Sequence, residues 1–175
     1  MKRGLVSSVL LVVGLSVVAL WAGLRAPARA HDAPRFVLPD LDGKVTRMED
    51  LRGKVVLLNL WATWCPPCVE EMPTLEALSK RMAGRDFTLL AVSEDDTPAL
   101  VRPWIEKHGF TFPVLLDPRG QLGADLGITG YPETFIIDRN GRIVHRHVGY
   151  RNWMEPGIVA ALERLMDTGE WRLAS

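Results

Sequence analysis

Runs of apolar residues mark the strands of an expected β-sheet. Residues 55–61 (VVLLNLW) and 87–93 (FTLLAVS) are almost continuously apolar, which is typical of strands that helices cover on both faces. Residues 69–83 between them form an expected helix, and Gly84 supplies a common helix terminus. These segments predict a right-handed β-α-β unit with parallel strands.

Turn signals define the remaining elements. Residues 36–46 predict a short β-hairpin with Asp42-Gly43 at its turn, and residues 133–149 predict a second hairpin around Asn140-Gly141. We also expect a helix from Thr97 to Gly109 that Pro103 shortens or kinks, a strand over residues 112–116, and helices over residues 120–126 and 154–168. The whole pattern is that of an α/β domain.

The first 30 residues have the pattern of an export segment. Lys2 and Arg3 precede an uncharged stretch over residues 4–24, and residues 28–30 (ARA) have the small-x-small pattern of a cleavage site. The stretch is also long enough to span a bilayer, for which about 20 residues are needed. We therefore expect a signal peptide or an N-terminal membrane anchor over residues 1–30. Either places the body of the protein in a bacterial periplasm, soluble or anchored at the outer face of the cytoplasmic membrane.

Charge excludes one class of partner. The chain has 21 basic and 21 acidic residues. Four of the basic residues and none of the acidic ones lie in residues 1–30, so the remainder has 17 basic and 21 acidic residues, a net charge of −4. This acidic body has no basic patch, and we expect no nucleic-acid partner.

The two cysteines carry the expected chemistry. Cys65 and Cys68 stand between the strand over residues 55–61 and the following helix. Unpaired N–H groups at a helix N-terminus favour a thiolate, which is the attacking species in disulfide exchange. A structural zinc site would need four ligands, and there is no second cysteine pair. A purely structural disulfide is the other alternative, although a bridge across so short a loop stabilises little.

Four segments together carry a family resemblance. They are residues 59–68 (NLWATWCPPC), residues 70–73 (EEMP), the insertion between Ser93 and Gly130, and residues 130–138 (GYPETFIID). The chain resembles thioredoxin-fold proteins of the TlpA/ResA-like branch, including the CcmG/DsbE type of cytochrome c maturation. The likeness covers residues 35–165. It implies a thioredoxin-like domain over residues 35–170, with an N-terminal β-hairpin and a central insertion between the β-α-β half and the C-terminal β-hairpin-α half.

The resemblance implies roles for the cysteines and for one proline. Cys65 would be the nucleophile, exposed at the helix start, and Cys68 the buried resolving thiol, with a Cys65–Cys68 disulfide in the oxidised form. Pro132 would be a cis-proline that faces this disulfide. It would leave the backbone of Tyr131 open to an extended client segment, with the Tyr131 side chain beside the active sulfur.

A proton acceptor is also implied. Thioredoxins proper have a buried Asp at the position of Asn59, and an amide cannot take a proton from the resolving thiol. The TlpA/ResA-like branch has a Glu three positions after its second cysteine, which matches Glu71. We expect Glu71 to accept the proton of Cys68 and to have a pKa raised by partial burial, while Glu70 stays solvated. A solvated Glu71 on the helix face is the alternative.

Aromatic residues and prolines complete the expected site. We expect Trp64 to lie on the surface over the cysteine pair and to contact clients, and Trp61 to anchor the core. Pro66 and Pro67 stiffen the turn, and Pro67 removes an N–H group from the helix start. His145 and His147 stand two apart on one face of a strand, which we expect to be an exposed face rather than a metal site.

The leading functional hypothesis is an extracytoplasmic thiol-disulfide oxidoreductase that reduces client proteins. By resemblance, a membrane thiol donor would supply electrons, and the clients would be apocytochrome c or copper-site proteins. No organic cofactor or metal is needed. One alternative is a copper-binding assembly factor, although such carriers usually have a wider cysteine spacing and a distal His. The other is a peroxiredoxin-like peroxidase, although Ala62 stands where that family has a Thr.

Overall fold

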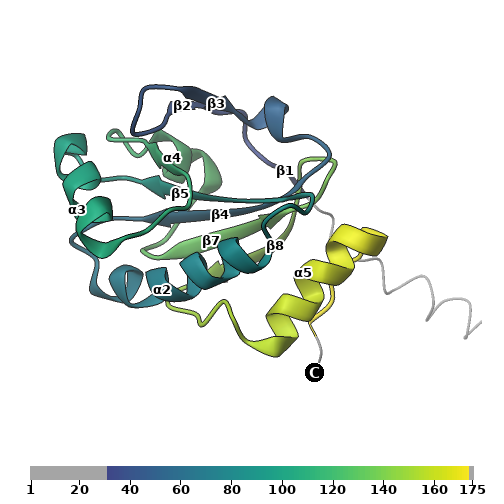
Figure 1. Cartoon of the computed structure of the whole chain (residues 1–175). Coiled ribbons are helices and arrows are strands. Elements are labelled where there is room, and N and C mark those ends of the chain that lie inside the picture. Colours follow the sequence, from purple (N-terminus) through teal and green to yellow (C-terminus); the bar gives the residue numbers. More distant parts are fainter. Residues whose placement is uncertain (1–30, 174–175) are drawn as a thin grey trace, which may run out of the picture. The chain divides into compact units, whose positions relative to one another are not determined.

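Strand β4 (Val55–Trp61) lies inside a six-stranded sheet in the computed structural model, which describes residues 31–173. The strand order is β1-β8-β7-β4-β5-β6 (Figure 1). β4 pairs with β5, and β5 with β6, in parallel, whereas the pairs β4–β7, β7–β8 and β8–β1 are antiparallel. The bounds of the other strands are β1 His31–Asp32, β5 Phe87–Ser93, β6 Val114–Leu116, β7 Glu133–Ile137 and β8 Arg142–Val148. The predicted order of parallel strands followed by an antiparallel hairpin is confirmed.

Alternation along β4 explains why the strand is buried throughout. Leu57 and Trp61 join the core cluster on one face of the sheet, which includes residues of α2, α3 and α5. Leu58 and Leu60 join the cluster on the other face, which includes residues of η1 and α4. Helices thus cover both faces (Figure 1). The bounds are η1 Met48–Leu51, α2 Pro66–Arg81, η2 Pro98–Leu100, α3 Val101–His108, α4 Gln121–Leu126 and α5 Pro156–Thr168.

The expected N-terminal hairpin and central insertion are both present. β2 (Val37–Pro39) and β3 (Val45–Arg47) pair as a separate two-stranded sheet. The insertion contains η2, α3, β6 and α4. Pro103 lies in the first turn of α3, where its missing N–H group would have no acceptor within the helix. For this reason the helix accommodates the proline.

The N-terminal side of the domain begins with β1. The described residues 31–173 belong to one compact unit, in which His31 and Asp32 pair with Ile143 and Arg142 of β8. The expected signal peptide or anchor over residues 1–30 lies outside the described residues. Within residues 31–173, no helix is both long and apolar enough to cross a membrane.

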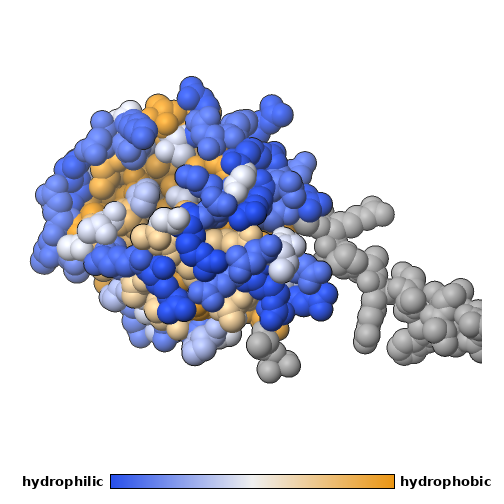
Figure 2. All heavy atoms as spheres, turned by 45° about the vertical axis from the view of Figure 1, so that its right-hand side comes forward, coloured by the Kyte–Doolittle hydropathy of each residue, from blue (hydrophilic) through white to orange (hydrophobic). Residues whose placement is uncertain are grey.

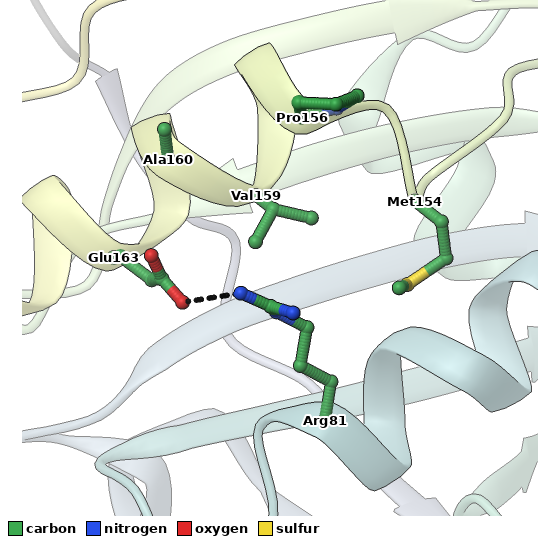
Figure 3. A pocket seen from close by; sticks show the side chains of 6 residues that line it. All are labelled: Arg81, Met154, Pro156, Val159, Ala160 and Glu163. Atoms are coloured by element: carbon green, nitrogen blue, oxygen red, sulfur yellow. Dashed lines mark hydrogen bonds and ion pairs between the residues drawn. The ribbon is translucent and has the colours of Figure 1, made fainter.

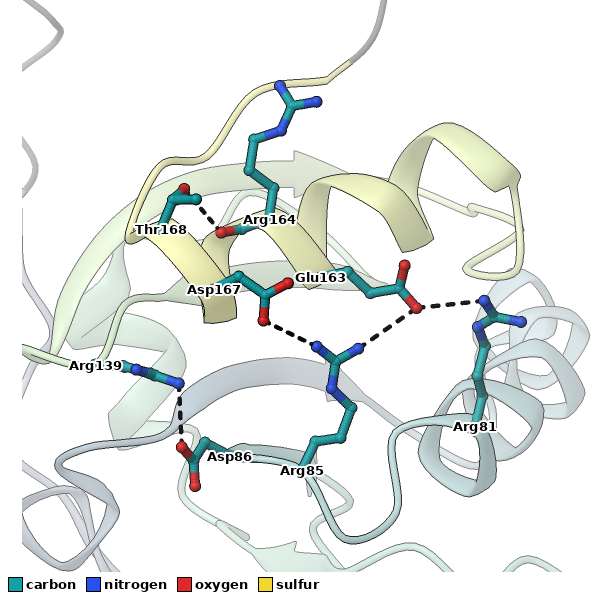
Figure 4. Close-up of polar contacts among 8 residues, drawn as sticks. All are labelled: Arg81, Arg85, Asp86, Arg139, Glu163, Arg164, Asp167 and Thr168. Carbon is teal, nitrogen blue, oxygen red and sulfur yellow. Dashed lines mark hydrogen bonds and ion pairs between the residues drawn. The ribbon is translucent and has the colours of Figure 1, made fainter.

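Polar contacts join α5 to the end of α2 and to the loop before β5. Arg85 lies between Glu163 and Asp167, with N–O distances of 3.5 and 3.1 Å (Figure 4). Arg81, at the end of α2 that is distant from the cysteines, contacts Glu163 and lines a shallow pocket with α5 (Figure 3). The arginines are partly exposed, so these ion pairs contribute at most about 1 kcal/mol each. Hydrophilic side chains cover much of the surface in this region of the molecule (Figure 2).

Candidate active site

Cys65 and Cys68 lie at the point where α2 begins. Cys65 is the N-cap residue of α2, and the two sulfur atoms are joined in a disulfide. The backbone N–H of Cys68 donates to Cys65 Sγ at 3.3 Å. Since Pro66 and Pro67 have no N–H group, this is the first N–H of the helix, and it is directed at the sulfur that would carry the negative charge.

The exposure expected for Cys65 is wrong for this disulfide-bonded form. Cys65 is only 4% exposed and Cys68 is fully buried, and both belong to the larger core cluster. The reason is that the Cys65 sulfur is bonded to Cys68 inside the first helical turn instead of pointing to solvent. Trp64 is the exposed residue here, at 62%, whereas Trp61 is buried, as expected for a core anchor.

Asp95 fixes the loop that leads from β4 to the cysteines. Its carboxylate accepts hydrogen bonds from the backbone N–H of Thr63, at 3.0 Å, and from the Thr63 hydroxyl. The hydroxyl of Ser93 donates to the same carboxylate. Residues 94–97 (EDDT) have the local pattern of a polar connection, but Glu94 and Asp95 are both buried. Their position directly after a buried parallel strand is the signal that could have identified them, because such strand ends commonly border functional sites.

The segment before β7 contacts this region through Tyr131, whose ring packs against Trp64. The peptide bond between Tyr131 and Pro132 is cis, which is the geometry implied by the family resemblance. The carbonyl of Pro132 accepts a hydrogen bond from the N–H of Gly149 at 2.8 Å. The Tyr131 ring meets the Trp64 ring edge-on with centroids 5.6 Å apart, and its phenol donates to Glu94 Oε2. Two aromatic rings from distant parts of the sequence therefore flank the disulfide segment.

Glu71 is fully buried on α2, one turn after Cys68. Its carboxylate accepts hydrogen bonds from Asn59 Nδ2 at 2.7 Å, from the N–H of Arg151 at 3.1 Å and from Trp153 Nε1 at 3.3 Å. Burial raises its pKa from 4.5 to about 7, although these three donors favour the ionised form. The alternative of a solvated Glu71 is wrong, because the loop after β8 covers the carboxylate. Glu70 is exposed, as expected.

Three residues that shape this region carry no signal in the local sequence. Arg151 and Trp153 come from the loop between β8 and α5, and no local motif marks them as partners of Glu71. Thr134 of β7 accepts a hydrogen bond from Asn59, so the amide links Glu71 to the neighbouring strand. Such contacts arise only when the second half of the fold packs against α2.

The expected exposed histidine face on β8 is wrong. His145 is half-buried and stacks on Trp171 with centroids 5.0 Å apart, and His147 meets Trp153 edge-on at 6.0 Å. The C-terminal segment covers this face, and burial lowers the pKa of His145. Among the described residues 31–173, no group of three or more His, Cys, Asp or Glu side chains could hold a metal ion.

Comparison with known proteins identifies the family. Residues 28–162 match the Redoxin family. The chain belongs to this family. It is 42% identical over 122 residues to the thioredoxin-like protein YneN of Bacillus subtilis, covering 68% of this chain and 71% of that protein. It is also 31% identical over 166 residues to the thiol-disulfide oxidoreductase ResA of the same organism, covering 89% of this chain and 93% of ResA.

A solved structure agrees with this assignment. The chain is similar to a thiol:disulfide interchange protein of the thioredoxin family from Chlorobium tepidum, with a TM-score of 0.63 and 35% identity over 72% of this chain and 90% of that one. With Cys65 and Cys68 paired at the start of α2, this Redoxin-family protein is a ResA-like thiol-disulfide oxidoreductase. None of these three names describes a peroxidase or a copper carrier.

Proposed function

We propose that this protein reduces disulfides in client proteins outside the cytoplasm and is itself reduced by a membrane thiol donor. The observation that supports the proposal best is the buried Glu71 carboxyl, three residues after Cys68 on the same side of α2. A carboxyl group with a pKa of about 7 can hold or release a proton at neutral pH. It is thus suited to take the proton of the resolving thiol when that thiol must attack.

The exchange has two steps. The Cys65 thiolate attacks one sulfur of a client disulfide, so that a mixed disulfide forms and the other client sulfur leaves as a thiolate. Glu71 then takes the proton of Cys68, and the Cys68 thiolate attacks Cys65 Sγ. This step forms the Cys65–Cys68 disulfide and releases the second client thiolate. Two electrons have passed to the client, and its thiolates take protons from solvent.

Client docking is assigned to the two segments beside the disulfide. An extended client segment would pair with the backbone of Tyr131 next to Pro132, a strand-addition mode of recognition. Trp64, together with Pro66 and Pro67, would form the facing surface. The edge-on contact between Trp64 and Tyr131 supports this assignment, because it brings the two segments to one place.

The client classes proposed are apocytochrome c and copper-site proteins. A Cys-x-x-Cys-His segment must be reduced before haem attachment, and cysteines must be reduced before they bind copper, so both chemistries require a dithiol reductant. The location proposed is the bacterial periplasm or the outer face of the cytoplasmic membrane. The basic start and the long uncharged stretch within residues 1–30 support this location.

Trapping of the mixed disulfide tests the proposal. In full-length protein, Cys68→Ala is expected to stay covalently linked to its client through Cys65, and added dithiothreitol should release the client. Cys65→Ala is the matched control, which keeps one thiol but should trap nothing. Purified apocytochrome c and a copper-site domain, each with an oxidised cysteine pair, serve as separate clients. The proposed reaction would be overturned if the wild-type protein reduced none of the three substrates: apocytochrome c, the copper-site domain and insulin.

A further inference from the structure

Glu94 occupies an unusual position for an acidic residue. It follows β5 directly, is only 9% exposed, and donates its backbone N–H to the carbonyl of Trp61 at 3.0 Å. Its carboxylate accepts the phenol hydrogen bond of Tyr131. Burying a carboxylate is costly unless donors satisfy it, so the Tyr131 phenol stabilises Glu94 in this position.

Gly123 of α4 makes room for this carboxylate. A Cβ atom at Gly123 of α4 would lie 2.5 Å from Glu94 Oε1, so any larger residue would displace the carboxylate. Glu94 therefore fills the space between α4 and Tyr131. Through it, the central insertion is in direct contact with the residue that precedes Pro132.

The hydrogen bond between Glu94 and Tyr131 is connected to the active site through the Trp64 ring. Tyr131 is half-buried and its ring meets the ring of Trp64, which is 62% exposed and directly precedes Cys65. The Trp64 side chain is largely exposed to solvent, and the Tyr131 ring is a group against which it packs. The phenol hydrogen bond holds the Tyr131 ring from its far end. The rings of Trp64 and Tyr131 form a surface that we call the aromatic wall.

We propose that Glu94 is a positioning residue that, by holding the Tyr131 phenol, fixes the aromatic wall and so lets the enzyme favour polypeptide disulfides over small ones. The inference rests on the proposed function, because it concerns how a client docks beside Cys65. A polypeptide client lays apolar side chains next to its cysteine on this wall. A small disulfide such as glutathione disulfide has far less surface to place there and depends mainly on the sulfur chemistry. An immobilised aromatic wall favours the larger client because less side-chain freedom is lost on docking.

Steady-state reduction of two substrates by the full-length protein tests this inference. Insulin is the polypeptide substrate and glutathione disulfide is the small one. Tyr131→Phe and Glu94→Leu are each expected to lower kcat/KM for insulin about tenfold, mainly by raising KM. A tenfold decrease is what the loss of one hydrogen bond to a charged group is expected to cause. The decrease in kcat/KM for glutathione disulfide should stay below about threefold in both variants. Glu94→Gln keeps an acceptor oxygen and should recover most of the insulin activity.

The double variant separates positioning from simple destabilisation. If Glu94 acts through the Tyr131 phenol, Tyr131→Phe should have almost no further effect in the Glu94→Leu background. Glu76→Gln is the matched control, because Glu76 is also a buried carboxylate with hydrogen bonds, to Thr111, but it lies away from the aromatic wall. Glu76→Gln should change kcat/KM for each of the two substrates by less than about twofold, because Glu76 lies outside the site.

Two results would overturn the inference. One is an equal decrease in kcat/KM for both substrates, which would show that Glu94 has a structural role only. The other is full additivity of the two substitutions, which would show that Glu94 and Tyr131 act independently. If the wild-type protein reduces neither substrate, the proposed function fails instead, and the two failures are thereby distinguished. Should Glu94→Leu not fold, Tyr131→Phe compared with Glu94→Gln decides the question, because both retain nearly native side-chain volumes.

Discussion

Replacement of Glu71 by Gln should remove a specific pH dependence of stability. The folded, disulfide-bonded protein holds the Glu71 proton with a pKa of about 7, compared with an ordinary value of 4.5. Between these two values the folded state binds more protons than the unfolded state, so stability falls as pH rises. The contribution is fully present below pH 4.5 and is lost as pH passes through about 7.

The magnitude follows from the difference between these two pKa values. At 1.36 kcal/mol for each pH unit, the full contribution is about 3.4 kcal/mol, and about 2.5 kcal/mol of it is lost between roughly pH 5 and pH 8. Glu71→Gln lacks this titration. The difference in unfolding free energy between wild type and variant should therefore shift by about 2.5 kcal/mol over that range, against the wild type. Any constant offset from altered hydrogen bonds cancels in this comparison.

Urea unfolding of the oxidised protein at several pH values measures this shift. Glu70→Gln, on the exposed side of the same helix, is the matched control for the loss of one carboxyl group from α2. Trp153→Phe removes one donor to the Glu71 carboxylate, so the loss of stability should extend to higher pH. A difference between wild type and Glu71→Gln that stays constant within about 0.5 kcal/mol would refute the reasoning, since burial would then not perturb this carboxyl.

Two further predictions concern the helix start and the insertion. Pro67→Ala adds an N–H group near Cys65 Sγ and should stabilise the thiolate of the reduced form, raising the reduction potential by about 10 to 20 mV in equilibrium with glutathione. Pro73→Ala, in the body of α2, is its control and should leave the potential unaltered. Gly123→Ala places a Cβ atom 2.5 Å from Glu94 Oε1 and 2.8 Å from Ile128 Cδ1. It should destabilise the protein by about 1 to 3 kcal/mol in thermal unfolding, whereas an undiminished melting temperature would show that this space is not tightly filled.

Local patterns determined much of this protein. The apolar run over residues 55–61 predicts β4 because only a strand covered on both faces hides every side chain. The Asn140-Gly141 turn predicts the hairpin of β7 and β8, and Gly141 adopts the positive φ of 76° at this turn. The cysteine pair, set between a strand and a helix, predicts disulfide exchange. Each of these inferences depends on neighbours within a few positions of the chain.

Tertiary structure alone decided the surroundings of the carboxyl groups. Glu71 and Glu70 are adjacent in the sequence, yet only Glu71 is covered, because the loop that carries Arg151 and Trp153 packs on its side of α2. Glu94 follows an apolar strand and has the pattern of a loop residue, but it is buried against Tyr131. The burial of a charged group depends on whether distant segments supply donors for it, and no local periodicity encodes that supply.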